Sequence, residues 1–206
     1  MILEFLPLAI KVIIICFSII GLYYSIGLNK KKFKKVSFIY FTNLNLVFCI
    51  IYFVFSIFVY NNKLLNDING FIILSATVTM IVYQFVLVPK YQKIGNSYKV
   101  FSPTNIVVHY VIPLLVILNW FIFTEKSQFS YYSPFLWIIP FLIYFSLIML
   151  HAHYSCLKEF KKVRYPYYFM DLDKIGVKKT LKNLLIFSSI AIALGYLLVF
   201  LDFFLK

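Results

Sequence analysis

Apolar residues run along this chain in six long blocks, separated by short stretches of polar and charged residues. Each block is about 20 residues long, the length of helix that crosses the hydrocarbon core of a bilayer. A chain that crosses lipid must satisfy its own backbone hydrogen bonds, so each block predicts a helix. We therefore predict an all-α bundle of six transmembrane helices forming one domain, residues 1–206, with spans at about 5–28, 37–60, 68–88, 104–123, 134–156 and 180–204.

Composition supports a membrane protein and excludes an ordinary soluble domain. Hydrophobic residues make up 63% of the chain and charged residues 13%, whereas soluble domains carry about 25% charged residues. Most of the 20 Lys and Arg lie in the first, third and fifth loops, while the second and fourth loops hold one lysine each, Lys63 and Lys126. This asymmetry predicts cytoplasmic odd-numbered loops and both termini outside. Anionic lipid headgroups are the expected partners of the basic loops, and nucleic acid is not expected.

The fourth block, TNIVVHYVIPLLVILNW, contains the strongest functional signal. Pro113 has no amide hydrogen to donate to the carbonyl of His109, so we expect the helix to be distorted there. Asn105 lies four residues before His109 and shares its helical face. A titratable side chain inside a membrane span indicates a functional site.

The predicted topology brings a second reactive group to the depth of His109. The second and fourth spans both begin at the cytoplasmic side, and Thr42 and His109 each lie about five residues, roughly 8 Å, inside their predicted helix starts. A neutral imidazole is a suitable base for a hydroxyl nucleophile. We therefore predict catalytic roles for Thr42 and His109, and we name as substrate or oxyanion candidates Asn43, Asn45, Asn105, Tyr83 and Gln84.

These residues also have purely structural interpretations. A membrane threonine commonly bonds its own backbone, asparagine amides often join helices, and a buried histidine can simply bond a carbonyl. His151 and His153 lie two residues apart and diverge on a helix, so interfacial positions are favoured over metal binding. The three cysteines, Cys16, Cys49 and Cys156, form no paired pattern. No metal or cofactor is expected.

Three segments resemble one known family. FTNLN at residues 41–45, NIVVHYVIPLLVILNW at residues 105–120 and YPYYFMDLD at residues 165–173 are similar to the androgen-induced and androgen-dependent membrane proteins and their bacterial branch. The resemblance covers most of the chain in matching order. It implies a membrane-embedded threonine hydrolase of fatty-acid esters of hydroxy fatty acids, with Thr42 and His109 at the family's threonine and histidine, in a bacterial cell membrane. Asn119 departs from the aspartate of the bacterial relatives.

Two other classes of function stay open at this stage. A non-enzymatic membrane scaffold or lipid-binding protein would use Thr42 and His109 only for packing and hydrogen bonding. A transporter is less favoured, because acidic residues are nearly absent from the spans, with only Glu4 and Asp202 at their margins.

Overall fold

The described part of the chain contains six long apolar helices, as the sequence predicts. The computed structural model describes residues 2–59, 62–94, 99–154 and 163–205, and these residues contain no β-strand. Two of the six helices are each built from three consecutive segments. The spans are α1 (Ile2–Ser25), α2 (Phe41–Phe58), α3–η3–α4 (Lys63–Val82, Tyr83–Leu87 and Val88–Ile94), α5–η4–α6 (Pro103–Ile106, Val107–Val111 and Ile112–Phe123), α7 (Ser133–Tyr154) and α9 (Val177–Phe204).

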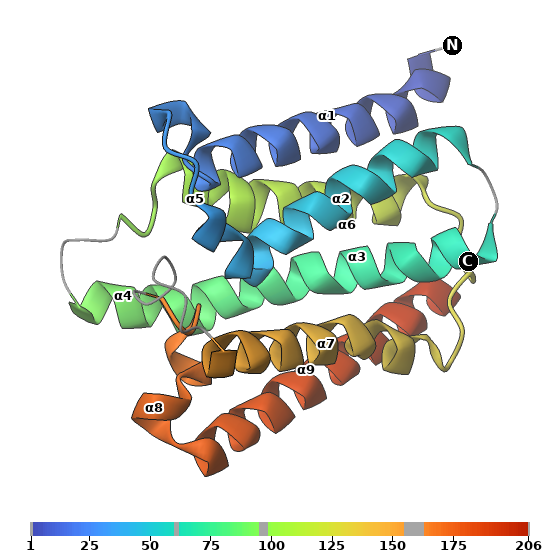
Figure 1. The fold of residues 1–206 in the computed structure, drawn as a ribbon. Coiled ribbons are helices and arrows are strands. Elements are labelled where there is room, and N and C mark those ends of the chain that lie inside the picture. The colour runs from blue at the N-terminus through green and yellow to red at the C-terminus, as the bar shows by residue number, and fades with distance from the viewer. Residues whose placement is uncertain (1, 60–61, 95–98, 155–162, 206) are drawn as a thin grey trace.

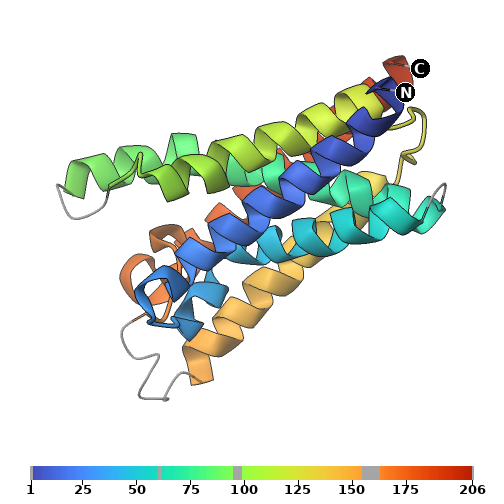
Figure 2. The ribbon, with the colours of Figure 1, turned by 90° about the horizontal axis from the view of Figure 1, so that it is seen from above.

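Helix α3 lies in the middle of the bundle. It packs against α2 and α6 on one side and against α7 and α9 on the other, while α1 covers α2 and α6 at the outer edge (Figure 1). Both chain ends lie at one end of the bundle, and the short helices α4 and α8 (Leu172–Ile175) lie at the opposite end (Figures 1 and 2). We call this opposite end the α4/α8 end. By the charge asymmetry it is the end expected to face the cytoplasm.

Burial follows this arrangement and is compatible with an integral membrane protein. Half of the residues in an apolar 18-residue stretch of the third span are buried, but only 11% of those in the corresponding stretch of α9 are buried. Large apolar side chains such as Phe58, Phe85 and Phe203 are more than 70% exposed. In water such exposure would be unfavourable, whereas in a bilayer these side chains contact lipid.

Several helix ends differ from the predicted boundaries. The second helix begins at Phe41, not near residue 37, because Lys35–Ile39 forms a 3-10 helix and Tyr40 is extended. The third helix begins at Lys63, not near residue 68, because the Asn62 side chain caps it by accepting a hydrogen bond from the Leu64 amide at 2.9 Å. It also continues past residue 88 to Ile94. The ends predicted at Tyr60 and Cys156 lie outside the described residues.

Close packing of α3 on α7 depends on one glycine. A Cβ atom placed on Gly70 would lie 1.9 Å from Cζ2 of Trp137, far inside any real contact distance. The Trp137 indole is buried and packs edge-on against Phe129 at 5.0 Å between ring centroids. Small residues at helix contacts allow such close approach in membrane bundles.

Candidate functional site

A largely apolar cavity lies toward the α4/α8 end of the bundle. Its volume is about 120 Å³. Its wall is built from α2, α3, the π-helical turns η3 and η4, α7, α9 and the loop residues Tyr167, Phe169 and Met170. Phenylalanine and aliphatic side chains form most of this wall. The polar residues that line it are Thr42, Thr79, His109, Tyr144, Tyr167, Thr180, Asn183 and Ser188.

Thr42 is the second residue of α2 and so lies in its first turn, closer to the helix start than predicted. The difference arises because the chain before it, residues 35–40, is not α-helical. Its side chain is half-buried and lines the cavity. The first turn of a helix carries amide hydrogens without intrahelical acceptors and a partial positive charge, so negative charge that develops near Thr42 is stabilised there.

His109 lies in a π-helical turn, Val107–Val111, where the sequence predicts a distortion. The amide of Ile112 donates to the carbonyl of Val107, five residues earlier, and Pro113 follows directly. Proline cannot donate to the carbonyl four residues before it, and a π-helical turn is one way for a helix to accommodate that loss. His109 is 8% exposed, lines the cavity and has no hydrogen-bond partner for its Nδ1 among the described residues.

A second π-helical turn lies beside the first. Tyr83–Leu87 interrupts the third span, and Pro89 follows it at the same spacing as Pro113 follows the turn that contains His109. The Tyr83 ring stacks on the imidazole of His109, with 3.6 Å between centroids and 7° between planes. The Tyr83 hydroxyl donates to the Val100 carbonyl. The stack therefore fixes the plane of the imidazole.

The amides of α2 named as oxyanion candidates have partners elsewhere. Asn43 donates from Nδ2 to the Ser37 carbonyl at 2.7 Å, and its Oδ1 accepts from the Ser25 hydroxyl at 2.6 Å. Asn45 accepts at Oδ1 from Ser75 at 2.6 Å. Both are buried, and neither is among the residues that line the cavity. These contacts hold α2 against α1 and α3.

Three other predicted residues surround the His109 turn without lining the cavity. Tyr83 stacks on the imidazole of His109. Asn105 donates from Nδ2 to the carbonyls of Lys99 and Val100 at 2.9 and 3.1 Å. Gln84 accepts at Oε1 from the Tyr110 hydroxyl at 2.6 Å. The structure thus brings Thr42 and His109 to one cavity and places the other candidates around it.

The loop before α9 contributes a residue that the sequence analysis did not select. The Tyr167 hydroxyl oxygen accepts a hydrogen bond from the Phe41 amide at 3.1 Å, and Phe41 directly precedes Thr42 in α2. Tyr167 is 9% exposed and lines the cavity. Burial raises the pKa of this phenol to about 12, so it stays protonated at neutral pH. The YPYYFMDLD motif was visible in the sequence, but nothing in it indicated that Tyr167 reaches α2.

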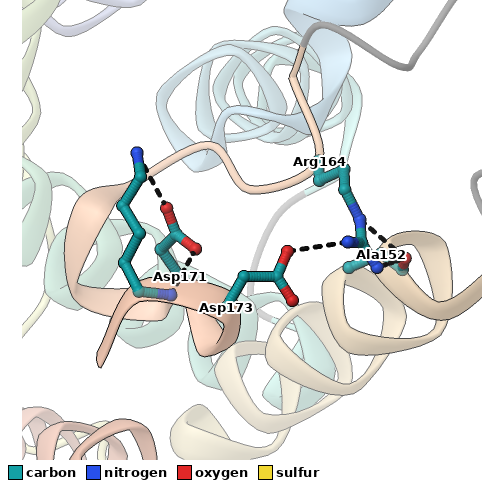
Figure 3. A network of polar contacts seen from close by, with 5 residues as sticks. Ala152, Arg164, Asp171 and Asp173 are labelled. Carbon is teal, nitrogen blue, oxygen red and sulfur yellow. Dashed lines mark hydrogen bonds and ion pairs between the residues drawn. The ribbon is translucent and has the colours of Figure 1, made fainter. Parts of the chain in front are cut away.

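Arg164 fixes this loop to the end of α7. Its Nε and Nη2 donate to the Ala152 carbonyl at 3.2 and 2.8 Å, and its Nη1 pairs with Asp173 of α8 at 2.7 Å (Figure 3). Asp171 accepts from the Lys174 amide at 3.2 Å and so caps α8. A guanidinium at the C-terminal end of a helix bonds carbonyls that have no intrahelical donor.

The other histidines and the cysteines, which are residue types that can bind metals, are spread over the bundle. His151 and His153 lie in the last turn of α7 and are not among the cavity residues. Cys49 is buried, Cys16 is exposed, and Cys156 lies outside the described residues. Across the described ranges, no three His, Cys, Asp or Glu side chains come together in a group able to hold a metal ion.

The cavity combines a hydroxyl, a neutral phenol and a buried imidazole with an otherwise apolar wall. Such a wall suits an acyl chain, and the polar groups suit proton transfer to and from a hydroxyl. No family model, curated protein or solved structure matches this chain. The resemblance to the androgen-induced and androgen-dependent membrane proteins therefore stays a prediction.

Proposed function

We propose that the chain is an intramembrane hydrolase of lipid esters, with Thr42 as nucleophile and His109 as base. One observation carries the proposal: Thr42 and His109, 67 positions apart, line the same cavity. The buried Nδ1 of His109, which has no hydrogen-bond partner within the described ranges, supports it, because a buried imidazole nitrogen without a partner is unfavourable unless it serves another purpose. The proposed substrates are fatty-acid esters of hydroxy fatty acids or related acyl lipids, in accordance with the family resemblance.

The proposed reaction has two stages. Thr42 Oγ1 attacks the ester carbonyl and its proton passes to His109; the bond to the leaving alcohol then breaks, and His109 returns the proton to the alkoxide. In the second stage His109 takes a proton from water, the hydroxide attacks the acyl-Thr42 ester, and the free fatty acid leaves as Thr42 regains its proton. The N-terminal turn of α2 stabilises the negative charge of each tetrahedral intermediate.

The proposed orientation places this chemistry in the inner leaflet. With the basic loops in the cytoplasm and both termini outside, the cavity lies near the cytoplasmic surface of a bacterial cell membrane. The lysines of the loops would hold anionic headgroups nearby.

Purified Thr42→Ala protein tests the proposal. We expect Thr42→Ala and His109→Ala each to lower ester hydrolysis by about 10³-fold or more, because they remove the nucleophile or its base. Thr77→Ala is the matched control: Thr77 is a half-buried threonine of α3 whose hydroxyl donates to the Ile73 carbonyl at 2.8 Å, away from the cavity. Equal hydrolysis by the Thr42→Ala and Thr77→Ala proteins would remove the enzyme proposal.

A lipid-binding protein without catalytic activity is the alternative. The observation that favours it is the composition of the cavity wall, in which phenylalanine and aliphatic side chains outnumber polar residues such as Thr42 and Tyr167. This alternative predicts that Thr42→Ala lowers thermal stability in detergent, while neither the wild type nor the variant hydrolyses any lipid ester. A fatty acid would then raise the melting temperature of both proteins.

A further inference from the structure

The first turn of α2 is capped from a distant part of the chain. Phe41 is the first residue of α2, so its amide has no intrahelical acceptor. Tyr40, the residue at the N-cap position, makes no side-chain cap hydrogen bond. The Tyr167 hydroxyl, 126 positions away in sequence, accepts the Phe41 amide hydrogen instead. Tyr167 therefore does for α2 what a local serine or aspartate does for most helices.

The phenol that provides this cap is held on several sides. Its ring stacks on Phe169, with 5.1 Å between centroids and 5° between planes, and meets the Tyr40 ring edge-on at 5.9 Å. The Phe169 carbonyl accepts from Asn183 Nδ2 of α9 at 2.9 Å. The Tyr144 hydroxyl of α7 donates to the Ile39 carbonyl at 2.8 Å and so holds the segment just before α2. Such contacts leave the phenol little freedom to move.

The same hydroxyl lies beside the proposed nucleophile. Thr42 follows Phe41 directly in α2, and both Thr42 and Tyr167 line the cavity. A threonine in a helix otherwise tends to turn its hydroxyl to its own backbone, where it is unavailable for reaction. The hydrogen bond from the Phe41 amide to Tyr167 fixes the first turn of α2, and with it Thr42, at the cavity wall. The loop that carries Tyr167 is in turn fixed to α7 by Arg164 (Figure 3).

We propose that Tyr167 is the positioning residue that orients the Thr42 hydroxyl for attack, a role that rests on the hydrolase function proposed above. The phenol does not take the proton of Thr42, because that is the task of His109. It fixes the rotamer of Thr42 and the first turn of α2, so that the hydroxyl meets the substrate carbonyl in a reactive geometry. A misplacement of about 1 Å in such a geometry costs about 10²-fold in rate.

Tyr167→Phe tests this role, because it removes the hydroxyl and keeps the stacked ring. We expect kcat to fall about 10- to 100-fold with KM changed less than about threefold, since the cavity wall is retained and only orientation is lost. Labelling by a fluorophosphonate probe should slow by a similar factor. Hydrogen exchange at the Phe41 amide and its neighbour in the first turn of α2 should become faster, because the acceptor of the Phe41 amide is removed.

Tyr168→Phe is the matched control. The Tyr168 hydroxyl, on the next residue of the same loop, donates to the Val86 carbonyl at 3.4 Å, and its side chain is 40% exposed. We expect this variant to keep wild-type kcat and wild-type exchange at residues 41–42. Because both variants lose one tyrosine hydroxyl from one loop, a difference between them is not a general effect of loosening that loop.

The outcomes separate the two proposals. If Thr42→Ala is inactive but Tyr167→Phe matches Tyr168→Phe in kcat and labelling, the positioning role is overturned and the hydrolase proposal stands. If Thr42→Ala is as active as the wild type, or the wild type hydrolyses no ester, both proposals fail. If Tyr167→Phe lowers the melting temperature strongly, labelling measured well below that temperature on protein shown to be folded decides the question: an unchanged rate overturns the role.

Discussion

The contact between Gly70 and Trp137 allows a quantitative test of the bundle. A Cβ on Gly70 would lie 1.9 Å from Cζ2 and 2.4 Å from Cε2 of the indole, whereas ordinary contacts begin at 3.4 Å. The ring would have to retreat by about 1.5 Å, and it is 2% exposed with Phe129 behind it. Overpacking a well-packed interior typically costs about 1–3 kcal/mol. Because neither helix can move away without opening the core, we expect Gly70→Ala to cost about 3 kcal/mol.

Thermal unfolding in detergent, followed by circular dichroism, measures this cost. A chain of this size loses about 2–4 °C per kcal/mol, so the melting temperature of Gly70→Ala should fall by roughly 6–12 °C. Gly21→Ala is the control: its Cβ would meet a side-chain methyl of Val108 at 3.0 Å and methyls of Ile112 and Leu46 at an ordinary 3.6 Å, and we expect a loss below about 1 kcal/mol. In the double variant with Trp137→Ala, the Gly70 substitution should cost much less. A melting temperature for Gly70→Ala equal to that of Gly21→Ala would refute the packing of α3 on α7.

Three further predictions concern the loops. Burial raises the Tyr167 pKa from 10.0 to about 12, so the unfolded chain loses this proton before the folded chain does. The free energy of unfolding should therefore fall by up to about 2–3 kcal/mol as pH rises from 10 to 12. In alkaline melting curves, Tyr167→Phe should show a smaller fall. Asp202→Ala should lower the free energy of unfolding by denaturant by about 3 kcal/mol, because the amides of Gln128 and Phe129 donate to its Oδ2 at 2.7 and 2.9 Å. Asp202→Asn keeps an acceptor oxygen and should lose less stability. Arg164→Ala should lower the melting temperature more than removal of its exposed ion-pair partner Asp173, because only the former also removes two hydrogen bonds to the Ala152 carbonyl.

The number and class of the helices could be predicted because bilayer thickness makes apolar block length informative. The ends of the helices could not be predicted equally well. Hydropathy detects the part of a helix that lies in lipid, whereas α3–η3–α4 extends from Lys63 to Ile94 through polar turns at both ends. Conversely, the apolar residues near 37–40 belong to a 3-10 helix and an extended residue, which hydropathy does not distinguish from the start of α2.

The site was only partly predictable. Depth along a span follows from residue count, which is why Thr42 and His109 could be paired from the sequence. Rotation about a helix axis does not follow from residue count in a span that is apolar on all sides. Asn43 and Asn45 therefore turned out to face Ser37 and Ser75, not the cavity. Tyr167 reaches α2 over 126 positions, a contact that depends on how α7 and α9 pack and that no local pattern encodes.

Mapping the residue that a fluorophosphonate probe modifies tests the central claim most directly. Wild-type protein in detergent would be labelled, digested and sequenced by mass spectrometry, with Thr42→Ala and Thr77→Ala treated in parallel. Our account predicts an adduct on Thr42 in the wild type and in Thr77→Ala, and no adduct in Thr42→Ala. An adduct on another residue, or labelling that persists in Thr42→Ala, would contradict it.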